Sequence, residues 1–245
     1  MGEIKRTILY KAHVDAGATL VDFGGWEMPI QYPDGIVAEH LYCRSRCGIF
    51  DVSHMGRIDV KGRDQVAFLQ HVLSSNVLAL DVNQAQYCII PDTAGGAVDD
   101  AYLYRFVEGQ YFLVINAGNI DKDLAHLEKA AAGFDVTLEN VSDRYAAIAV
   151  QGPEAKKLLM ILSGGKTLTT ENVKNALGTL TMEGKPVRIA KTGYTGEPIG
   201  YELYCDSADA RYFWDRLLAL GARPMGLGAR DTLRMDDVLP ALQLK

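Results

Sequence analysis

The sequence predicts an α+β protein in which a β-rich unit is inserted into a larger unit of helices and sheet. Strand-like segments follow one another closely between residues 84 and 116, so hairpins rather than helical crossovers join them. Helical segments return on both sides of this group. The 245 residues contain no fixed-period repeat and no low-complexity linker. We therefore expect two closely joined units, one made of residues 1–53 with 116–245, the other of residues 54–115.

Apolar periodicity and glycine breaks give the elements of the first half. The expected helices cover residues 7–16, 36–47 and 63–73, and the last has a clear apolar stripe. The expected strands cover residues 20–23, 49–52, 55–60, 84–90, 97–106 and 111–116. Gly24 and Gly25 break the first strand, and Glu108-Gly109 supplies the turn between the last two.

In the second half, residues 145–150 predict a buried strand because they are apolar on both faces. Pro153 and Glu154 suit the first turn of the helix that continues over 156–162. The other expected helices are 120–132, 207–220 and 227–237. The other expected strands are 134–138, 186–190 and 201–205.

Composition excludes several classes of protein. A net charge of −6 argues against a broad nucleic-acid surface. The four cysteines, Cys43, Cys47, Cys88 and Cys205, do not have metal-site spacing, so we expect no metal and packed thiols in a reducing compartment. No apolar run suits a signal peptide or a membrane span, and we expect a bacterial or archaeal cytosolic protein with no membrane partner.

Asp99 and Asp100 lie in the first part of a strand that follows Gly95 and Gly96, with Ala97 and Val98 between. Adjacent side chains of a strand point to opposite faces, so one carboxylate can face solvent or cap the turn while the other points inward. The pair is then either the polar end of a turn or includes a partly buried carboxylate tuned for proton transfer. Spacing alone favours the turn.

Two polar residues mark neighbouring strands. Asn116 ends an apolar strand, and its amide must either cap the following helix or contact a ligand in a cleft. Tyr87 lies within a strand and by itself would be a core residue.

Three further candidates lie in the last third of the chain. Tyr194 sits on a loop between two glycines, where it can form the lid of a site for an aromatic ligand. Strand alternation puts Glu202 and Tyr204 on one face, where the carboxylate either lies exposed at an edge or accepts hydrogen bonds from a ring with adjacent N–H donors. Arg230 either pairs with Asp231 or reaches a ligand.

Together these segments resemble the aminomethyltransferase family, the T-protein of the glycine cleavage system. The matching motifs run in order from about Thr7 to Arg234. They are residues 21–29 (VDFGGWEMP), 48–56 (GIFDVSHMG), 95–100 (GGAVDD), 116–117 (NA), 122–123 (KD), 151–153 (QGP), 192–197 (TGYTGE) and 226–231 (GLGARD).

The resemblance implies a folate-binding fold with a ferredoxin-like main domain and an inserted β-rich domain. It also implies a reaction in one-carbon metabolism and glycine catabolism. The lipoyl arm of a carrier, the H-protein, would donate an aminomethyl group to tetrahydrofolate, which gives 5,10-methylenetetrahydrofolate and ammonia.

The family's functional positions fall on particular residues of this chain. Its essential carboxylate falls on Asp100, which would handle the proton and charge as a folate nitrogen attacks the aminomethyl carbon. Glu202 would accept hydrogen bonds from the pterin ring, and Tyr87 and Tyr194 would wall the ring or its linker. The folate-contacting positions fall on Met55, Tyr87, Val114, Asn116, Tyr194, Glu202 and Arg230.

The chain departs from the family pattern in three places. The family continues into a third, β-rich domain, whereas this sequence stops at Lys245, so we expect the C-terminal β-barrel-like domain to be absent or supplied by a second chain. The stretch before Glu202 is one residue longer than usual, and residues 234–237 (RMDD) replace the usual continuation. Two alternatives stay open: a tetrahydrofolate-dependent demethylase with another methyl donor, and a non-catalytic folate-binding module.

Overall fold

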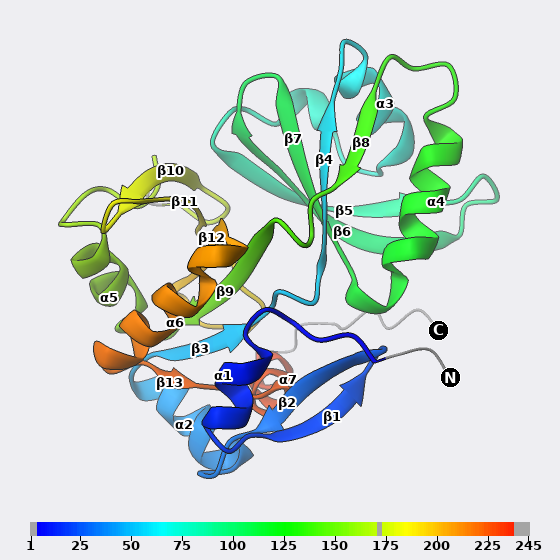
Figure 1. Cartoon of the computed structure of the whole chain (residues 1–245). Coiled ribbons are helices and arrows are strands. Elements are labelled where there is room, and N and C mark those ends of the chain that lie inside the picture. Colours follow the sequence, from blue (N-terminus) through cyan, green and yellow to red (C-terminus); the bar gives the residue numbers. More distant parts are fainter. Residues whose placement is uncertain (1–3, 171–172, 238–245) are drawn as a thin grey trace.

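The structure, a computed structural model, describes residues 4–170 and 173–237. Its strands form three sheets, and two of these make up most of the molecule (Figure 1). The predicted α+β class is confirmed, since all the strand pairs of the named sheets except one short parallel pair are antiparallel.

The six-stranded sheet has the order β10-β11-β12-β9-β3-β13. Its strands are β3 (Gly48–Asp51), β9 (Tyr145–Gln151), β10 (Leu177–Met182), β11 (Lys185–Ala190), β12 (Gly200–Asp206) and β13 (Arg223–Pro224). Helices α1 (Tyr10–Asp15), α5 (Ala155–Leu162) and α6 (Ala210–Ala219) contribute to the hydrophobic cluster on one face, and the short helix η3 (Ser207–Asp209) leads into α6.

The five-stranded sheet has the order β5-β6-β7-β4-β8. Its strands are β4 (Gly56–Lys61), β5 (Gln84–Pro91), β6 (Ala97–Val107), β7 (Gln110–Ile115) and β8 (Thr137–Asn140). Helices α3 (Gln65–Val72) and α4 (Ile120–Ala130) cover its outer face (Figure 1). Two short helices, η1 (Val77–Ala79) and η2 (Ala117–Asn119), lie in its connections.

A third, two-stranded sheet is a hairpin of β1 (Thr19–Phe23) and β2 (Trp26–Gln31). Helices α2 (Ile36–Ser45) and α7 (Leu227–Asp236) lie beside it and contact each other. The expected break at Gly24 and Gly25 is therefore the turn of this hairpin, and both glycines have positive φ angles that other residues adopt rarely.

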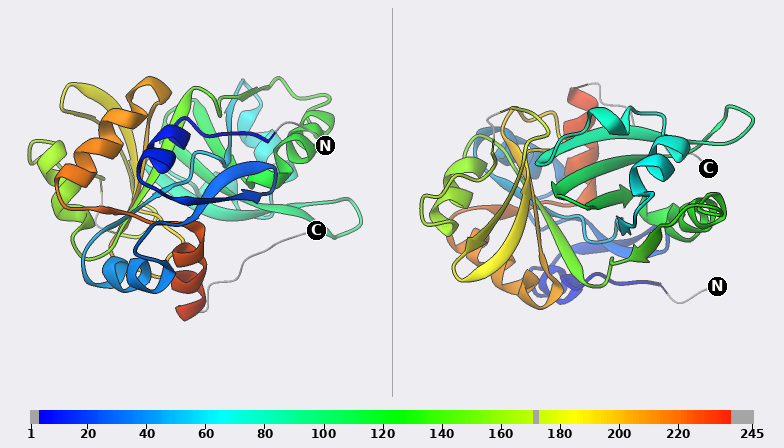
Figure 2. Two further views of the ribbon diagram at one scale, coloured as in Figure 1. Left: turned by 60° about the horizontal axis from the view of Figure 1, so that its bottom comes forward. Right: turned by 90° about the horizontal axis from the view of Figure 1, so that it is seen from above.

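The alternation of side chains explains how the two large sheets pack. Along β9, Ala146, Ile148 and Val150 face the helices, while Ala147 and Ala149 join the opposite cluster. This strand is therefore buried on both faces, as predicted. The inner faces of both large sheets contribute to one hydrophobic cluster, and the two sheets lie side by side in Figure 2.

The sequence placed the end of the β-rich unit too early. Strand β8 pairs with β4 over four residue pairs, and Ile120 and Leu127 of α4 belong to the core of the five-stranded sheet. Defined by its sheet, the unit runs from Gly56 to Asn140, beyond the expected end at residue 115. The strand itself begins at Thr137 rather than at residue 134.

Candidate functional site

Seven of the eight predicted site residues lie on, or directly beside, elements that border the space between the two large sheets. Asp100 lies in β6, Tyr87 in β5, Val114 in β7, Glu202 in β12 and Arg230 in α7, while Met55 precedes β4 and Asn116 follows β7. Met55 and Val114 pack in the inter-sheet cluster. Tyr194 lies in the loop between β11 and β12.

Asp99 and Asp100 point to opposite faces of β6, as alternation requires. Ala101 and Leu103, in phase with Asp99, belong to the core under α3 and α4, whereas Tyr104, in phase with Asp100, belongs to the inter-sheet cluster. Neither carboxylate is a solvent-exposed side chain at the end of a turn, because Asp99 is fully buried and Asp100 is half-buried. The interpretation favoured by spacing alone is therefore wrong.

The Asn116 side chain holds the Asp100 carboxylate. Its Nδ2 donates to Asp100 Oδ1 at 2.6 Å and to Asp99 Oδ1 at 2.9 Å. Asn116 occupies the N-cap position of η2, yet its side chain makes no capping hydrogen bond. Of the two roles left open for this amide, helix capping is thus wrong, and the amide fixes the two aspartates instead.

Burial raises the pKa of Asp100 above its usual value, against hydrogen bonds from Asn116 and Tyr87 that lower it. The charge of Asp99 raises this pKa further. Because a raised pKa makes a carboxylate a better proton acceptor, Asp100 suits general base work. Tyr87 lies beside it with 40% of its surface exposed, so this tyrosine is not the core residue that its position alone suggested.

Glu202 lies at the centre of a group of hydroxyls. Its Oε2 accepts hydrogen bonds from Thr192 Oγ1 at 2.7 Å, Tyr104 Oη at 2.9 Å and Tyr204 Oη at 3.1 Å. No hydrogen bond within the described part of the chain uses its Oε1. Since a carboxylate can accept about four hydrogen bonds, this side chain retains capacity for the N–H groups of a ligand.

Arg230 lies on α7, within electrostatic range of Glu202 and Tyr194. Burial lowers the pKa of its guanidinium, and electrostatic interactions with Glu202, Tyr204 and Tyr194 act against that shift. Its Nη1 is buried, and no residue within 4–170 or 173–237 accepts a hydrogen bond from it. Asp231 instead accepts from Arg234 Nε at 2.7 Å, so of the two alternatives for Arg230 the pair with Asp231 is not formed.

Tyr194 lies within electrostatic range of both Asp100 and Arg230. Burial raises the pKa of this phenol, the charge of Asp100 raises it further, and the charges of Arg234 and Arg230 lower it. A residue that is affected by Asp100 from one sheet and by Arg230 from α7 lies near both. The structure therefore brings the predicted acid–base residue and the predicted ring-binding residues into one region.

Sequence reasoning missed several aromatic and polar members of this region. Tyr102 and Tyr104 lie on β6 in phase with Asp100, with ring centroids 5.5 Å apart, and Tyr87 packs on Tyr102 at 6.0 Å. Alternation from Asp100 would have found both residues. Thr192, which donates to Glu202, gave no such signal because it lies in a loop.

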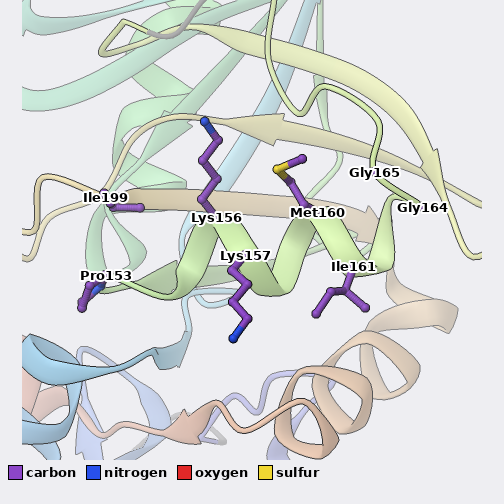
Figure 3. A pocket seen from close by; sticks show the side chains of 8 residues that line it. All are labelled: Pro153, Lys156, Lys157, Met160, Ile161, Gly164, Gly165 and Ile199. Atoms are coloured by element: carbon purple, nitrogen blue, oxygen red, sulfur yellow. The ribbon is translucent and has the colours of Figure 1, made fainter.

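An open depression of about 710 Å³ lies elsewhere, along α5 (Figure 3). It shares no residue with the inter-sheet region. In Figure 3 the side chains of Lys156 and Lys157 point in different directions from the helix, so they do not converge on a common point. Its lining residues are Pro153, Lys156, Lys157, Met160, Ile161, Gly164, Gly165 and Ile199.

Among the described residues, no three His, Cys, Asp or Glu side chains gather as metal ligands would. Within the same ranges, none of the helices combines the length and apolarity needed to cross a lipid bilayer. All four cysteines are buried and form no disulfide.

Comparison with known protein families gives a match over almost the whole chain. The model of the GCVT N-terminal domain family matches residues 9–243. The aminomethyltransferase of Deinococcus deserti is 48% identical over 241 residues, which are 97% of this chain and 65% of that protein. The aminomethyltransferase of Bacillus subtilis is 44% identical over 246 residues, and the chain covers 66% of it. The chain thus spans about two thirds of the length of these relatives.

Solved structures give a similar result. The glycine cleavage system aminomethyltransferase T of Bartonella henselae superimposes with a TM-score of 0.88 at 34% identity, covering 97% of this chain and 64% of that one. A heterotetrameric sarcosine oxidase from Corynebacterium sp. U-96 matches over 94% of this chain with a TM-score of 0.58 at 12% identity. The second likeness is one of fold alone.

Proposed function

Because this chain belongs to the GCVT N-terminal domain family, we propose that it carries the tetrahydrofolate-binding and catalytic part of an aminomethyltransferase of the glycine cleavage system. The donor in this proposal is the aminomethyl group on the lipoyl arm of a carrier protein, the H-protein. The products are 5,10-methylenetetrahydrofolate, ammonia and the reduced lipoyl arm. The proposed site of reaction is the cytosol.

One observation carries the proposal: a half-buried carboxylate, Asp100, and a hydroxyl-bound carboxylate, Glu202, both face the region between the two sheets. Tyrosine rings of β5 and β6 lie along this region, and such rings suit the faces of a flat heterocycle. Glu202 would accept from adjacent N–H groups of the pterin, while Tyr87 and Tyr194 would wall it. Met55, Val114 and Asn116 would complete the folate contacts.

The proposed chemistry requires proton transfer beside Asp100. Formation of a methylene bridge makes two bonds from the aminomethyl carbon to folate nitrogens and breaks its bonds to nitrogen and sulfur. Two folate N–H protons must therefore move to the departing ammonia and thiol. The raised pKa of Asp100 suits it to accept and pass on such a proton, and its negative charge would stabilise a developing cation.

Arg230 is proposed as a further folate contact. Its buried Nη1 is the kind of donor that a ligand oxygen would satisfy, because a buried cationic donor without an acceptor is costly. Arg230 also lies within electrostatic range of Glu202 and Tyr194, so the same ligand could reach all three residues.

The proposal is tested with the Asp100→Asn variant. We expect transfer from an aminomethyl-loaded lipoyl carrier to tetrahydrofolate to fall by about two orders of magnitude or more, as is typical when a general base is lost. The dissociation constant of tetrahydrofolate, measured by calorimetry, should change little, because Asn keeps the size of the side chain. Turnover within a few-fold of wild type would show that the role assigned to Asp100 is wrong.

The same assay separates the remaining alternatives. Each form of the protein is incubated with tetrahydrofolate and either the loaded lipoyl carrier or small S- or O-methylated donors. If product forms only with the methylated donors, the protein is a demethylase that uses another one-carbon donor and not the lipoyl-borne one. Tetrahydrofolate binding without product in either arm would favour a non-catalytic folate-binding module.

A further inference from the structure

Two buried carboxyl side chains, Asp99 and Asp123, lie on the face of β6 opposite Asp100. Asp99 of β6 and Asp123 of α4 both have no exposed surface. Asp99 accepts hydrogen bonds at 2.9 Å from three donors, the side-chain amides of Asn116 and Asn119 and the backbone N–H of Asp100. These donors satisfy an ionised carboxylate.

Asp123 has the opposite environment. Neither of its carboxyl oxygens accepts a hydrogen bond from any residue in the described ranges. The ammonium of Lys122 lies 3.7 Å from Oδ1 but donates to the carbonyl oxygen of Val98 at 2.8 Å. A buried carboxylate without donors is strongly disfavoured, so the environment of Asp123 favours its neutral, protonated form.

The pKa values of the two carboxyls influence each other. Burial raises the pKa of Asp123 to about 8, and the hydrogen bond and charge of Asp99 contribute to this rise. The pKa of Asp99 shifts the other way: burial would raise it, but hydrogen bonds from Asp123, Asn119 and Asn116 together lower it. Two adjacent buried carboxyls cannot both ionise cheaply, so one proton between them is the stable state.

We propose that Asp99 and Asp123 share one proton and that this pair, acting through Asn116, positions the Asp100 carboxylate in the site. One side-chain nitrogen, Asn116 Nδ2, bonds to both Asp99 and Asp100, and the backbone of Asp100 also bonds to Asp99. A rotation of the Asp99 carboxylate would therefore disturb both the Asn116 side chain and the backbone N–H of Asp100, which together set the position of the Asp100 side chain. Asp123 supplies the donor that prevents this rotation. The inference rests on the function proposed above.

Few other charged or titratable groups affect the pair. Asp100 follows Asp99 on β6, and Tyr87 of β5 faces Asp100 rather than Asp99. Lys122 is the neighbouring cation on α4. Lys5, from the N-terminal segment, lies 3.9 Å from the exposed Asp121 instead. Burial and Asp99 therefore raise the pKa of Asp123, and the charge and hydrogen bond of Lys122 act against that rise.

Two variants of Asp123 separate positioning from packing. Asp123→Ala removes the donor, and we expect kcat for aminomethyl transfer to fall about tenfold or more with the KM for tetrahydrofolate within about threefold. Asp123→Asn keeps the shape and supplies an N–H donor in place of the O–H, so kcat should stay within about threefold of wild type. Equal losses in both variants would overturn the proposal, because an ionised Asp123 cannot be replaced by Asn. Asp121→Asn, an exposed site on the same helix, is the matched control.

The pH profile gives a second readout. A carboxyl with a pKa of about 8 holds its proton below that pH and loses it above. Wild-type kcat should therefore fall as the pH rises through about 8, and in Asp123→Asn this fall should vanish because there is no proton to lose. A fall that persists unchanged in Asp123→Asn would contradict the shared proton.

Infrared difference spectra test the pair without turnover. Wild type minus Asp123→Asn should show the C=O stretch of a protonated carboxyl at pH 7, shifted in D₂O and lost above about pH 8. If the band is present but wild type transfers nothing, the proposed function fails and the proton-sharing pair stands. If the band is absent at pH 7, the pair fails whatever the activity.

Discussion

At the scale of single residues, Glu202 illustrates how a ligand acceptor is built. Three hydroxyls donate to one of its oxygens, which fixes the plane of the carboxylate before any ligand arrives. A fixed acceptor has little side-chain entropy left to lose on binding. Glu202 therefore presents its carboxylate in a defined direction, which matters for a ligand with adjacent N–H donors.

Replacement of this charge should weaken ligand binding. In Glu202→Gln, one oxygen becomes an NH₂ group that cannot accept, so either the hydroxyl cluster or the ligand loses an acceptor. A hydrogen bond to a charged group contributes roughly 1.5–3 kcal/mol, and we expect the dissociation constant of tetrahydrofolate to rise by roughly 10- to 100-fold in calorimetry.

The exposed Glu139 of β8, changed to Gln, is the control for this experiment. An unchanged affinity in Glu202→Gln would rule out direct recognition of the ligand by this carboxylate.

Much of this residue-scale arrangement could be predicted from strand alternation. The pattern placed Glu202 and Tyr204 on one face, and a hydrogen bond of 3.1 Å joins them. It also separated Asp99 from Asp100. Alternation cannot predict that Tyr104, 98 positions away along the chain, donates to Glu202, because that contact depends on how two sheets pack. The proposed pairing of Asp99 with Asp123 of α4 could not be predicted for the same reason.

At the scale of elements, α7 depends on a close approach to β2. Gly226 is the N-cap residue of this helix, and its N–H donates to the buried Glu39 at 2.7 Å. A Cβ at this position would overlap the carbonyl oxygen of Ile30 and lie 2.6 Å from the nitrogen of Gln31. These are backbone atoms that cannot move aside, so a side chain here would push the helix away from the hairpin.

We therefore expect Gly226→Ala to reduce both stability and ligand binding. Overpacking of this kind costs about 1–3 kcal/mol, which urea denaturation would measure as a loss in the free energy of unfolding. Tetrahydrofolate should also bind more weakly, because the first turn of α7 leads to Arg230, whose N–H bonds to the carbonyl of Gly226.

Gly118→Ala is the matched control for Gly226→Ala. A Cβ at Gly118 would meet only Gly24 Cα at 4.0 Å, so this change should leave both properties nearly unaltered. Equal effects in the two variants would show that the approach of α7 to β2 is not the cause.

Three elements that the sequence did not predict share a physical reason. Strand β2 contains Pro29, and proline usually indicates an edge or no strand. Strand β10 contains Gly178, where the carbonyl oxygen of Leu168 approaches so closely that no side chain would fit. Strand β13 has two residues, too few for any periodicity. In each case pairing with a neighbouring strand rather than local preference accounts for the strand.

At the scale of the whole molecule, the chain passes from the six-stranded to the five-stranded sheet between β3 and β4 (Figure 1). His54 lies in this connection, 4% exposed, with its ring edge-on to Phe23 at 5.9 Å. Its Nδ1 has no hydrogen-bond partner among the described residues. A neutral imidazole thus occupies the joint between the two sheets.

Protonation of this histidine should destabilise the fold in mild acid. Burial lowers the pKa of His54 to about 4, against an attraction by Asp51 and with further lowering by the charges of Arg230 and Arg57. In the unfolded chain its pKa is near 6.5. Below pH 6.5 the unfolded state therefore binds the proton first, so the stability of the fold falls as the pH drops from 6.5 towards 4.

The size of this effect can be measured by unfolding His54→Gln, which carries no charge at any pH. Between pH 7 and pH 5, wild type should lose about 2 kcal/mol of unfolding free energy more than this variant. Exposed His71, changed to Gln, should keep the wild-type dependence. Parallel curves for wild type and His54→Gln would mean that His54 is not buried in its neutral form. A selective loss in wild type would instead identify the connection that contains His54 as the acid-sensitive part of the molecule. Because the candidate site is formed by residues from both sheets, this loss should also weaken the site.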